Sequence, residues 1–311
     1  MLETEVAGIK LRNPLILASG VLGTNASLLK RVERAGAGAL TTKTILPRPT
    51  KGFPNPVVVE LPYGLLNAMG LPNPGIEEFE RELREARAEV SIPIIGSAGG
   101  STPEEVAHVA GRLEDAGADA IEVNASCPHV RGHGLEIGST PEMMRDLIRE
   151  VRKSVKVPVI AKLSPMVPDI RALGRSALEA GADALNAINT VRAMYIDIEA
   201  MAPVLSNKFG GLSGSAIRPI AVRCVYELAE LCDVIGTGGV ETWRDAVEMI
   251  LAGAKAVGIG TAVYRRGLGV FEEIRSGLEA YLQRKGLTLR ELVGSARRDD
   301  PYLLSSRCPQ A

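Results

Sequence analysis

Short apolar runs alternate with longer amphipathic segments along this chain. Each run has four or five residues and is rich in Val, Ile, Leu and Ala. Such runs are typical of strands in a parallel sheet that is buried on both faces. The predicted strands are residues 15–18, 39–42, 94–97, 120–124, 159–162, 184–188, 234–237 and 256–260.

An amphipathic segment follows each predicted strand. Four of these segments end in Ala-Gly-Ala, and glycine is favoured just after the last turn of a helix because it adopts the left-handed conformation. Thr102-Pro103 and Thr140-Pro141 are typical of helix starts. The predicted helices are residues 27–35, 74–89, 103–116, 141–155, 170–180, 217–231, 242–252 and 269–285.

Eight strand–helix units in one chain predict an α/β fold, a single (β/α)8 TIM barrel. A doubly wound open sheet is the competing arrangement, but it usually carries GxGxxG after its first strand, and this chain has none there. We expect the barrel domain to cover residues 1–287 and a polar tail to follow over residues 288–311. Long loops follow strands two, four and six, and two of them span residues 44–73 and 191–215. Because these loops follow strands, they are expected on the catalytic face.

Composition narrows the class of protein. The chain has 311 residues, 46% of them hydrophobic and 23% charged, with a formal net charge of −1. No basic run stands out, so nucleic acid is not expected as a partner. No apolar run approaches the roughly 20 residues that span a bilayer. The acidic N-terminus lacks the pattern of a signal peptide, so a cytoplasmic protein without membrane contact is predicted.

The four cysteines contain no CxxC pair, which argues against a zinc or iron–sulfur site in this chain. Cys224 and Cys232 lie in an apolar stretch and are expected to pack as small hydrophobic residues. Cys308 lies in the polar tail and suggests no function.

Cys127 differs from the other cysteines, because it follows a predicted strand, precedes Pro128 and leads into a glycine-rich loop. It could act as a nucleophile with His129 or His133, act as a general base, or be a buried apolar residue. The chain shows no acyl-transfer signature, which disfavours the nucleophile. We interpret Cys127 as the reactive group of an enzyme.

Glycine-rich sequences end the last two predicted strands, Gly236-Thr237-Gly238-Gly239 and Gly258-Ile259-Gly260-Thr261. In TIM barrels, the loops after strands seven and eight commonly bind phosphate through backbone N–H groups and a helix N-terminus. Glycines that only turn the chain are the alternative. Two such sequences at these two strands favour a phosphorylated ligand.

Polar residues also stand at the ends of other predicted strands. Lys43 and Lys162 are placed where a cation could stabilise negative charge on a bound ring. Asn67, Asn124 and Asn189 add amides, which both donate and accept hydrogen bonds. Amides therefore suit a heterocycle with alternating N–H and C=O groups.

With these motifs in this order, the chain resembles class 1 dihydroorotate dehydrogenases, most closely the NAD-linked B-type catalytic subunit. The match runs from Asn13-Pro14 to about Leu287. The motifs that carry it are Leu17-Ala18-Ser19-Gly20, Thr42-Lys43-Thr44, Asn67-Ala68-Met69-Gly70-Leu71, residues 124–128, Ala161-Lys162-Leu163, Ile188-Asn189-Thr190, Gly210-Gly211-Leu212-Ser213-Gly214, Gly238-Gly239 and Gly260-Thr261.

The resemblance implies a flavoprotein that oxidises dihydroorotate to orotate in de novo pyrimidine (UMP) biosynthesis, with one FMN across the barrel mouth. The positions that match the family's FMN contacts are Ser19, Lys43, Thr44, Asn124, Lys162, Ile188, Gly214, Gly238, Gly239, Gly260 and Thr261. The positions that match its substrate contacts are Lys43, Asn67, Ala68, Met69, Gly70, Leu71, Asn124, Asn189 and Thr190.

The resemblance also implies the catalytic roles. Cys127 would be the general base that removes a proton from C5 of dihydroorotate while hydride leaves C6 for the flavin. Lys162 would stabilise the anionic reduced flavin. Lys43 would supply positive charge for the substrate carboxylate.

One residue departs from the family pattern, because His129 stands where Ser-Cys-Pro is usually followed by Asn. The resembling domain of dihydropyrimidine dehydrogenase also has histidine there, so a dihydropyrimidine-type dehydrogenase acting on dihydrouracil or dihydrothymine is the alternative. A flavin-free phosphate-binding lyase or isomerase, or a non-catalytic FMN scaffold, would have no need of Cys127.

The resemblance further implies a homodimer joined by an electron-transfer subunit, which would make a heterotetramer. That subunit would carry FAD and a 2Fe–2S cluster, for which this chain has no sequence pattern. An A-type enzyme would instead be reoxidised by fumarate. The sequence at residues 210–214 resembles the B-type.

Overall fold

Eight parallel strands close into a barrel in the computed structural model, which describes residues 1–125 and 138–297. Around the barrel the strand order is β10-β15-β16-β3-β4-β7-β8-β9, and β16 pairs with β3 to close the ring. The predicted (β/α)8 barrel is therefore confirmed. The barrel strands are β3 (Leu15–Leu17), β4 (Ala39–Thr41), β7 (Ile94–Ala98), β8 (Ala120–Asn124), β9 (Val159–Leu163), β10 (Ala184–Ala187), β15 (Val234–Thr237) and β16 (Ala256–Ile259).

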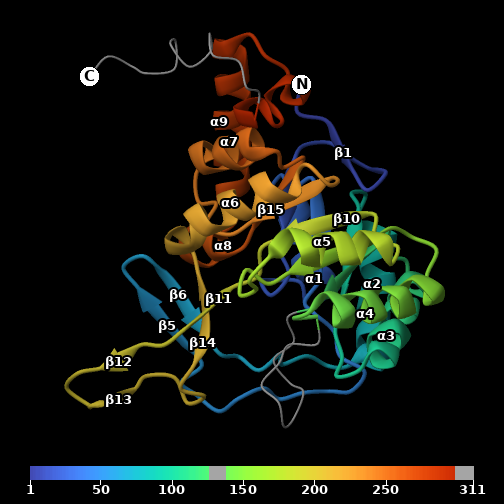
Figure 1. The fold of residues 1–311 in the computed structure, drawn as a ribbon, viewed down its shortest axis with the longest axis vertical. Coiled ribbons are helices and arrows are strands. Elements are labelled where there is room, and N and C mark those ends of the chain that lie inside the picture. The colour runs from blue at the N-terminus through green and yellow to red at the C-terminus, as the bar shows by residue number, and fades with distance from the viewer. Residues whose placement is uncertain (126–137, 298–311) are drawn as a thin grey trace.

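Helices surround the barrel and bury one face each against it (Figure 1). In α2, for example, Phe79, Leu83 and Ala86 are buried, whereas most of the charged residues between them are exposed or half-buried. Helix starts follow the sequence signals, and the Thr102 side chain accepts a hydrogen bond from the N–H of Glu105. The helices are α1 (Ala26–Arg34), α2 (Ile76–Glu89), α3 (Pro103–Asp115), α4 (Pro141–Ser154), α5 (Ile170–Glu179), α6 (Arg218–Leu228), α7 (Trp243–Ala252), α8 (Thr261–Arg266) and α9 (Val270–Lys285).

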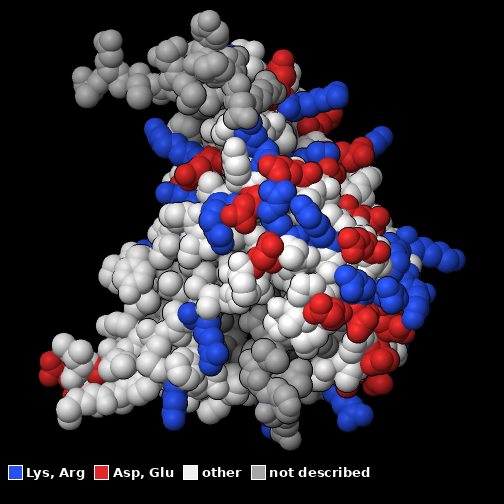
Figure 2. Space-filling model, in the orientation of Figure 1, with Lys and Arg blue, Asp and Glu red and all other residues white. Residues whose placement is uncertain are grey.

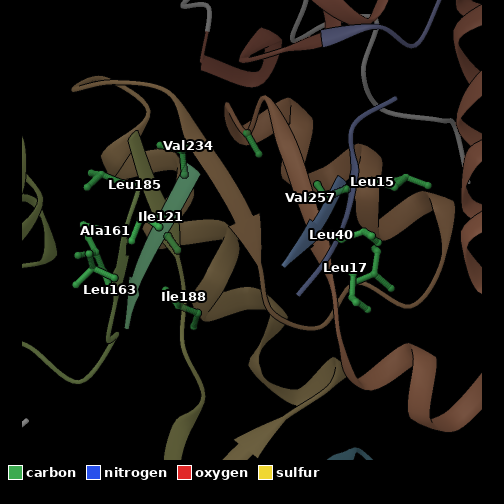
Figure 3. Packing of buried hydrophobic residues seen from close by; sticks show 14 of the residues in the cluster. Leu15, Leu17, Leu40, Ile121, Ala161, Leu163, Leu185, Ile188, Val234 and Val257 are labelled. Atoms are coloured by element: carbon green, nitrogen blue, oxygen red, sulfur yellow. The ribbon is translucent and has the colours of Figure 1, made fainter. Parts of the chain in front are cut away.

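Alternate residues of each strand point into the barrel or outward to the helices. Outward residues such as Ile121 and Val257 belong to the large apolar core between barrel and helices (Figure 3). Inward residues form a second, smaller apolar cluster. Its barrel members are Ile16, Ala39, Ile95, Ala120, Ile160, Ala184, Ile235 and Ala256.

An N-terminal hairpin packs against this inner apolar cluster. It consists of β1 (Thr4–Val6) and β2 (Ile9–Leu11), and Val6, Ile9 and Leu11 are buried in the cluster. The hairpin therefore closes the end of the barrel at which the strands begin. The sequence pattern did not predict it.

The two longest predicted loops pair with each other in a four-stranded antiparallel sheet, which we call the mouth sheet. β6 pairs with β14, so residues 65–67 lie beside residues 211–213. A two-stranded arm extends beyond the sheet (Figure 1). The mouth sheet consists of β5 (Val58–Leu61), β6 (Gly64–Asn67), β14 (Gly210–Ser213) and β11 (Val191–Ala193), and the arm of β12 (Ile196–Asp197) and β13 (Ala202–Pro203).

Packed structure continues beyond residue 287, where the polar tail was expected to begin. A short helix, α10 (Leu289–Leu292), buries Leu289 and Leu292, and the N–H of Gly294 donates to the carbonyl of Ile250 in α7. A 3-10 turn follows at Ser295–Arg297. Buried leucines hold the start of this segment, and polar contacts hold its end, where Arg297 forms an ion pair with Glu230 at 2.8 Å.

Within the described ranges, no helix is long and apolar enough to cross a membrane. On the face shown in Figure 2, charges of both signs are mixed over the helices, whereas the region of the mouth sheet carries few. On this face, the mouth sheet therefore carries fewer charged side chains than the helices do.

Candidate active site

A layer of polar side chains lies inside the barrel, two residues beyond the inner apolar cluster on four of the eight strands. We call the side chains of Ser97, Glu122, Lys162 and Asn186 the polar layer. They come from the neighbouring strands β7, β8, β9 and β10, and each is at most 4% exposed. Because strand side chains alternate with a period of two, these residues point inward like Ile95, two positions earlier in β7.

Hydrogen bonds connect the polar layer to Ser19, just beyond β3. The Asn186 amide donates to Glu122 Oε2 at 2.6 Å, and Ser97 Oγ donates to Glu122 Oε1 at 3.2 Å. Lys162 Nζ lies 3.7 Å from Glu122 Oε1 and donates to Ser19 Oγ at 2.8 Å. The predicted residues Lys162 and Ser19 are thus in direct contact.

A chain of hydrogen bonds runs from the polar layer to the predicted substrate amides. Ser97 Oγ lies 3.0 Å from Thr44 Oγ1, which accepts from the Asn124 amide at 3.1 Å. Asn124 Oδ1 in turn accepts from the Asn189 amide at 3.1 Å. Three residues that the sequence places at the ends of different strands therefore share one network.

The mouth sheet brings further predicted residues to the same place. The Asn67 amide donates to the carbonyl of Gly211 at 3.3 Å, and a Cβ added at Gly211 would lie 2.2 Å from Thr190 Oγ1. Asn67 and Thr190 thus meet at one residue of β14. Met69 and Gly70 instead contact Phe53 within their own loop.

The glycines at the ends of strands seven and eight converge with Gly214. A Cβ on Gly239 (φ +78°) would lie 2.8 Å from the carbonyl oxygen of Gly214. A Cβ on Gly214 (φ +95°) would lie 3.5 Å from the methyl carbon of Thr261. Thr261 Oγ1 donates to Ser213 Oγ at 2.8 Å. Thr261 begins α8, so its N–H has no acceptor within the helix. Bare backbone and free N–H groups fit a phosphate.

Two other predicted cofactor positions border this region. A Cβ on Gly238 would lie 3.4 Å from Ile188 Cγ1, and a Cβ on Gly260 would lie 3.6 Å from Ala18 Cβ, next to Ser19. The glycine region and the polar layer are thus adjacent parts of one mouth.

Lys43 is a buried cation at the barrel mouth. Its side chain is 6% exposed, and no carboxylate in the described ranges lies within ion-pair distance. Burial lowers the pKa of its ammonium group below the ordinary 10.5. A ligand carboxylate brought into the mouth would favour the charged form, so Lys43 suits an anionic ligand.

The described cysteines are unsuitable as bases. Cys224 is buried on α6, and burial raises the pKa of its thiol. Burial also raises the pKa of Cys232, to about 12. The expectation that Cys224 packs as a small hydrophobic residue is confirmed. Cys127 and Cys308 lie outside the described residues.

Sequence reasoning missed Ser97, Glu122 and Asn186. Each stands inside a run that reads as an apolar strand. The signal was a polar or charged residue at an inward position, since such residues are rarely buried without partners. Glu122, within Ala120-Ile121-Glu122-Val123, carries that signal most clearly.

Comparison with known proteins places this chain in a family. The family model described as Dihydroorotate dehydrogenase matches residues 1–282. This chain belongs to the dihydroorotate dehydrogenase family. The resemblance inferred from the motifs is confirmed.

Members of the dihydroorotate dehydrogenase family from several archaea match the chain over nearly its whole length. The relative from Pyrococcus abyssi is named Dihydroorotate dehydrogenase B (NAD(+)), catalytic subunit, and is 54% identical over 299 residues, 95% of this chain and 99% of its own. Relatives with the same name from Methanocella arvoryzae and Methanocaldococcus jannaschii are 50% and 48% identical and cover 94% and 95% of this chain, with 96% and 98% of their own lengths matched.

Lys43→Met is expected to flatten the pH dependence of stability. The folded protein holds the Lys43 proton less tightly than the unfolded chain, so wild-type stability rises with pH from the lowered pKa to 10.5. Thermal unfolding of the ligand-free protein from neutral pH to 10.5 measures this rise. Lys51→Met, at an exposed position in the following loop, is the control and should keep the wild-type curve. Identical curves for Lys43→Met and wild type would refute the assignment.

Proposed function

We propose that this chain catalyses the FMN-dependent oxidation of dihydroorotate to orotate, a step of pyrimidine biosynthesis. The observation that carries the proposal is the connected polar mouth in a chain that matches the dihydroorotate dehydrogenase family over residues 1–282. Amides, a buried cation and a glycine-lined phosphate region meet there.

The residues at the mouth fit FMN. Gly214 and Gly239 offer backbone where a Cβ would collide, and Thr261 offers the first N–H of α8, which together suit the phosphate group. Ser19, Lys43, Thr44, Asn124, Lys162, Ile188, Gly238 and Gly260 complete the proposed cofactor set. FMN, when bound, supplies an acceptor for the hydride of the substrate.

The chain's own residues would perform the remaining tasks. We assign to Lys162 the positive charge that favours reduction of the cofactor, because its ammonium is held inside the mouth by Ser19 and Glu122. Cys127 would accept the proton from C5 of the substrate. Amides of Asn67, Asn124 and Asn189 would orient the heterocycle through paired donors and acceptors.

Lys43 favours dihydroorotate over an uncharged dihydropyrimidine. Its buried ammonium has no carboxylate partner within the described part of the chain, and the carboxylate of dihydroorotate would supply one. Thr190 also belongs to the proposed substrate set, and its N–H donates to Asn189 Oδ1 at 2.9 Å. The remaining members of that set are Ala68, Met69, Gly70 and Leu71.

A partner polypeptide would carry the electrons onward. The relatives are named as catalytic subunits of an NAD-linked enzyme, and this chain has no iron–sulfur cysteine pattern. We propose an electron-transfer subunit with FAD and a 2Fe–2S cluster, joined to a homodimer of this chain in the cytoplasm. The arm exposes Ile198 and Met201, and such apolar surface supports assembly with another polypeptide.

An absorption spectrum tests the proposed function directly. The protein reconstituted with FMN should be yellow and should bleach when dihydroorotate is added without oxygen. A protein that stays colourless after reconstitution would contradict the flavin assignment. Bleaching by dihydrouracil but not by dihydroorotate would favour the dihydropyrimidine alternative that His129 raises.

Cys127→Ala should retain FMN but slow flavin reduction by dihydroorotate about 10²–10⁴-fold, because a positioned general base contributes about that factor. Stopped-flow absorbance measures the rate. Cys224→Ala, which removes a buried thiol from α6, is the matched control and should reduce at the wild-type rate. A wild-type rate in Cys127→Ala would remove this residue from the mechanism.

The isolated chain should reduce NAD⁺ poorly while it reduces an artificial dye well, because the proposed path to NAD⁺ runs through another subunit. Steady-state assays with dihydroorotate and each acceptor compare the two rates. Equal rates with NAD⁺ and with the dye would show that no partner is needed.

A further inference from the structure

Glu122 is a buried carboxylate at the centre of the polar layer. It lies on β8, is 2% exposed, and points into the barrel between strands β7 and β9. A carboxylate in this position loses its hydration, and the loss must be offset by hydrogen bonds and an opposite charge. The barrel supplies both.

Three neighbouring strands provide these partners. Ser97 of β7 donates to Oε1, and Asn186 of β10 donates to Oε2 at 2.6 Å. Lys162 of β9 places its ammonium 3.7 Å from Oε1. The neutral donors fix the carboxylate, and the carboxylate then provides a fixed negative charge beside Lys162.

Lys162 needs such a charge, because its side chain is only 5% exposed. Among the described residues, Glu122 provides the carboxylate that lies within ion-pair distance of the Lys162 ammonium. Nζ also contacts the Ser19 hydroxyl, 2.8 Å away, but that group is neutral. Without Glu122, the buried ammonium would lose its counter-charge, which is strongly unfavourable in a protein interior.

We propose that Glu122 is a positioning residue of the flavin reaction, and that its carboxylate holds the Lys162 ammonium in place and directed to the barrel mouth. The inference rests on the proposed function for its redox consequence. Glu122 belongs to neither the proposed substrate set nor the proposed cofactor set, and it acts through Lys162.

Two modes of action predict opposite effects on the reduction potential of bound FMN. If Glu122 acted only through its own negative charge, its removal would raise the potential, because a nearby anion opposes reduction. If it acts by holding Lys162, its removal lowers the potential, because the cation is lost from the mouth or displaced. The sign of the change therefore separates the two modes.

The first experiment measures the reduction potential of FMN bound to Glu122→Gln and to wild type. Glutamine keeps the shape and can still accept from Asn186, so the change is mainly in charge. We expect a fall of about 30 mV or more, which is tenfold in the equilibrium of a two-electron couple. A rise, or no change, would overturn the proposal.

Asp119→Asn is the matched control. Asp119 precedes β8 at the opposite end of the strand, where it accepts from Arg87 at 2.8 Å and from the N–H of Ile94 at 2.7 Å. Its substitution removes an ion-paired carboxylate far along the same strand from the mouth. The potential should stay at the wild-type value, whatever the loss of stability.

A second experiment needs no FMN. Unfolding of the ligand-free protein is compared for Glu122→Gln, Lys162→Met and the double variant. Each single variant should raise the unfolding equilibrium constant. If the two charges support each other, the increase in the double variant is at least tenfold smaller than the product of the two single increases. Additive losses would overturn the ion pair, even if Glu122→Gln fails to retain FMN.

The two experiments also separate this inference from the proposed function. If wild type does not bind FMN or is not reduced by dihydroorotate, the proposed function fails, whereas the double-variant cycle still tests the ion pair. If wild type behaves as proposed and Glu122→Gln matches it in potential, only the role of Glu122 fails.

Discussion

Each barrel strand is hydrogen-bonded to a parallel neighbour on both edges, and this closure makes all eight strands end at one mouth. The position of a residue within its strand then decides what it can do. In β8, Ile121 and Val123 face the helices, whereas Glu122 and Asn124 face the interior and join the hydrogen-bonded network. The chemistry of the site is thus a consequence of the alternation of side chains along each strand: apolar residues fill the inner layer at the closed end, and polar residues of β7, β8, β9 and β10 fill the next layer.

The repeating elements could be predicted because local signals mark them. Apolar runs gave the strands, and Ala-Gly-Ala marked helix ends to within a residue, as at Ala116 after α3. Residues that end an apolar run, such as Lys162 and Asn124, were recognised because a polar side chain there faces the mouth. The roles given to these residues, and to Cys127 outside the described ranges, stay predictions.

The pairing of segments that lie far apart in the sequence could not be predicted from local signals. No local pattern shows that residues 65–67 pair with residues 211–213, since each segment alone reads as a loop. Glu122 and Asn186 were hidden for a related reason: each sits in a run whose average character is apolar, and they become partners only when β8, β9 and β10 lie side by side. Buried polar groups of this kind are specified by the closed barrel and not by their neighbours in sequence.

The N-terminal hairpin has a consequence for the order in which the protein can fold. Val6, Ile9 and Leu11 are made first by the ribosome, yet they pack against Ala256, near the end of the barrel. The N–H of Val257 also donates to the carbonyl of Pro14, so the first and last strands complete each other. Contacts of such sequence separation form slowly. The inner apolar cluster therefore stays incomplete until almost the whole chain has been synthesised, and the emerging barrel must keep its edges from pairing with other chains until then.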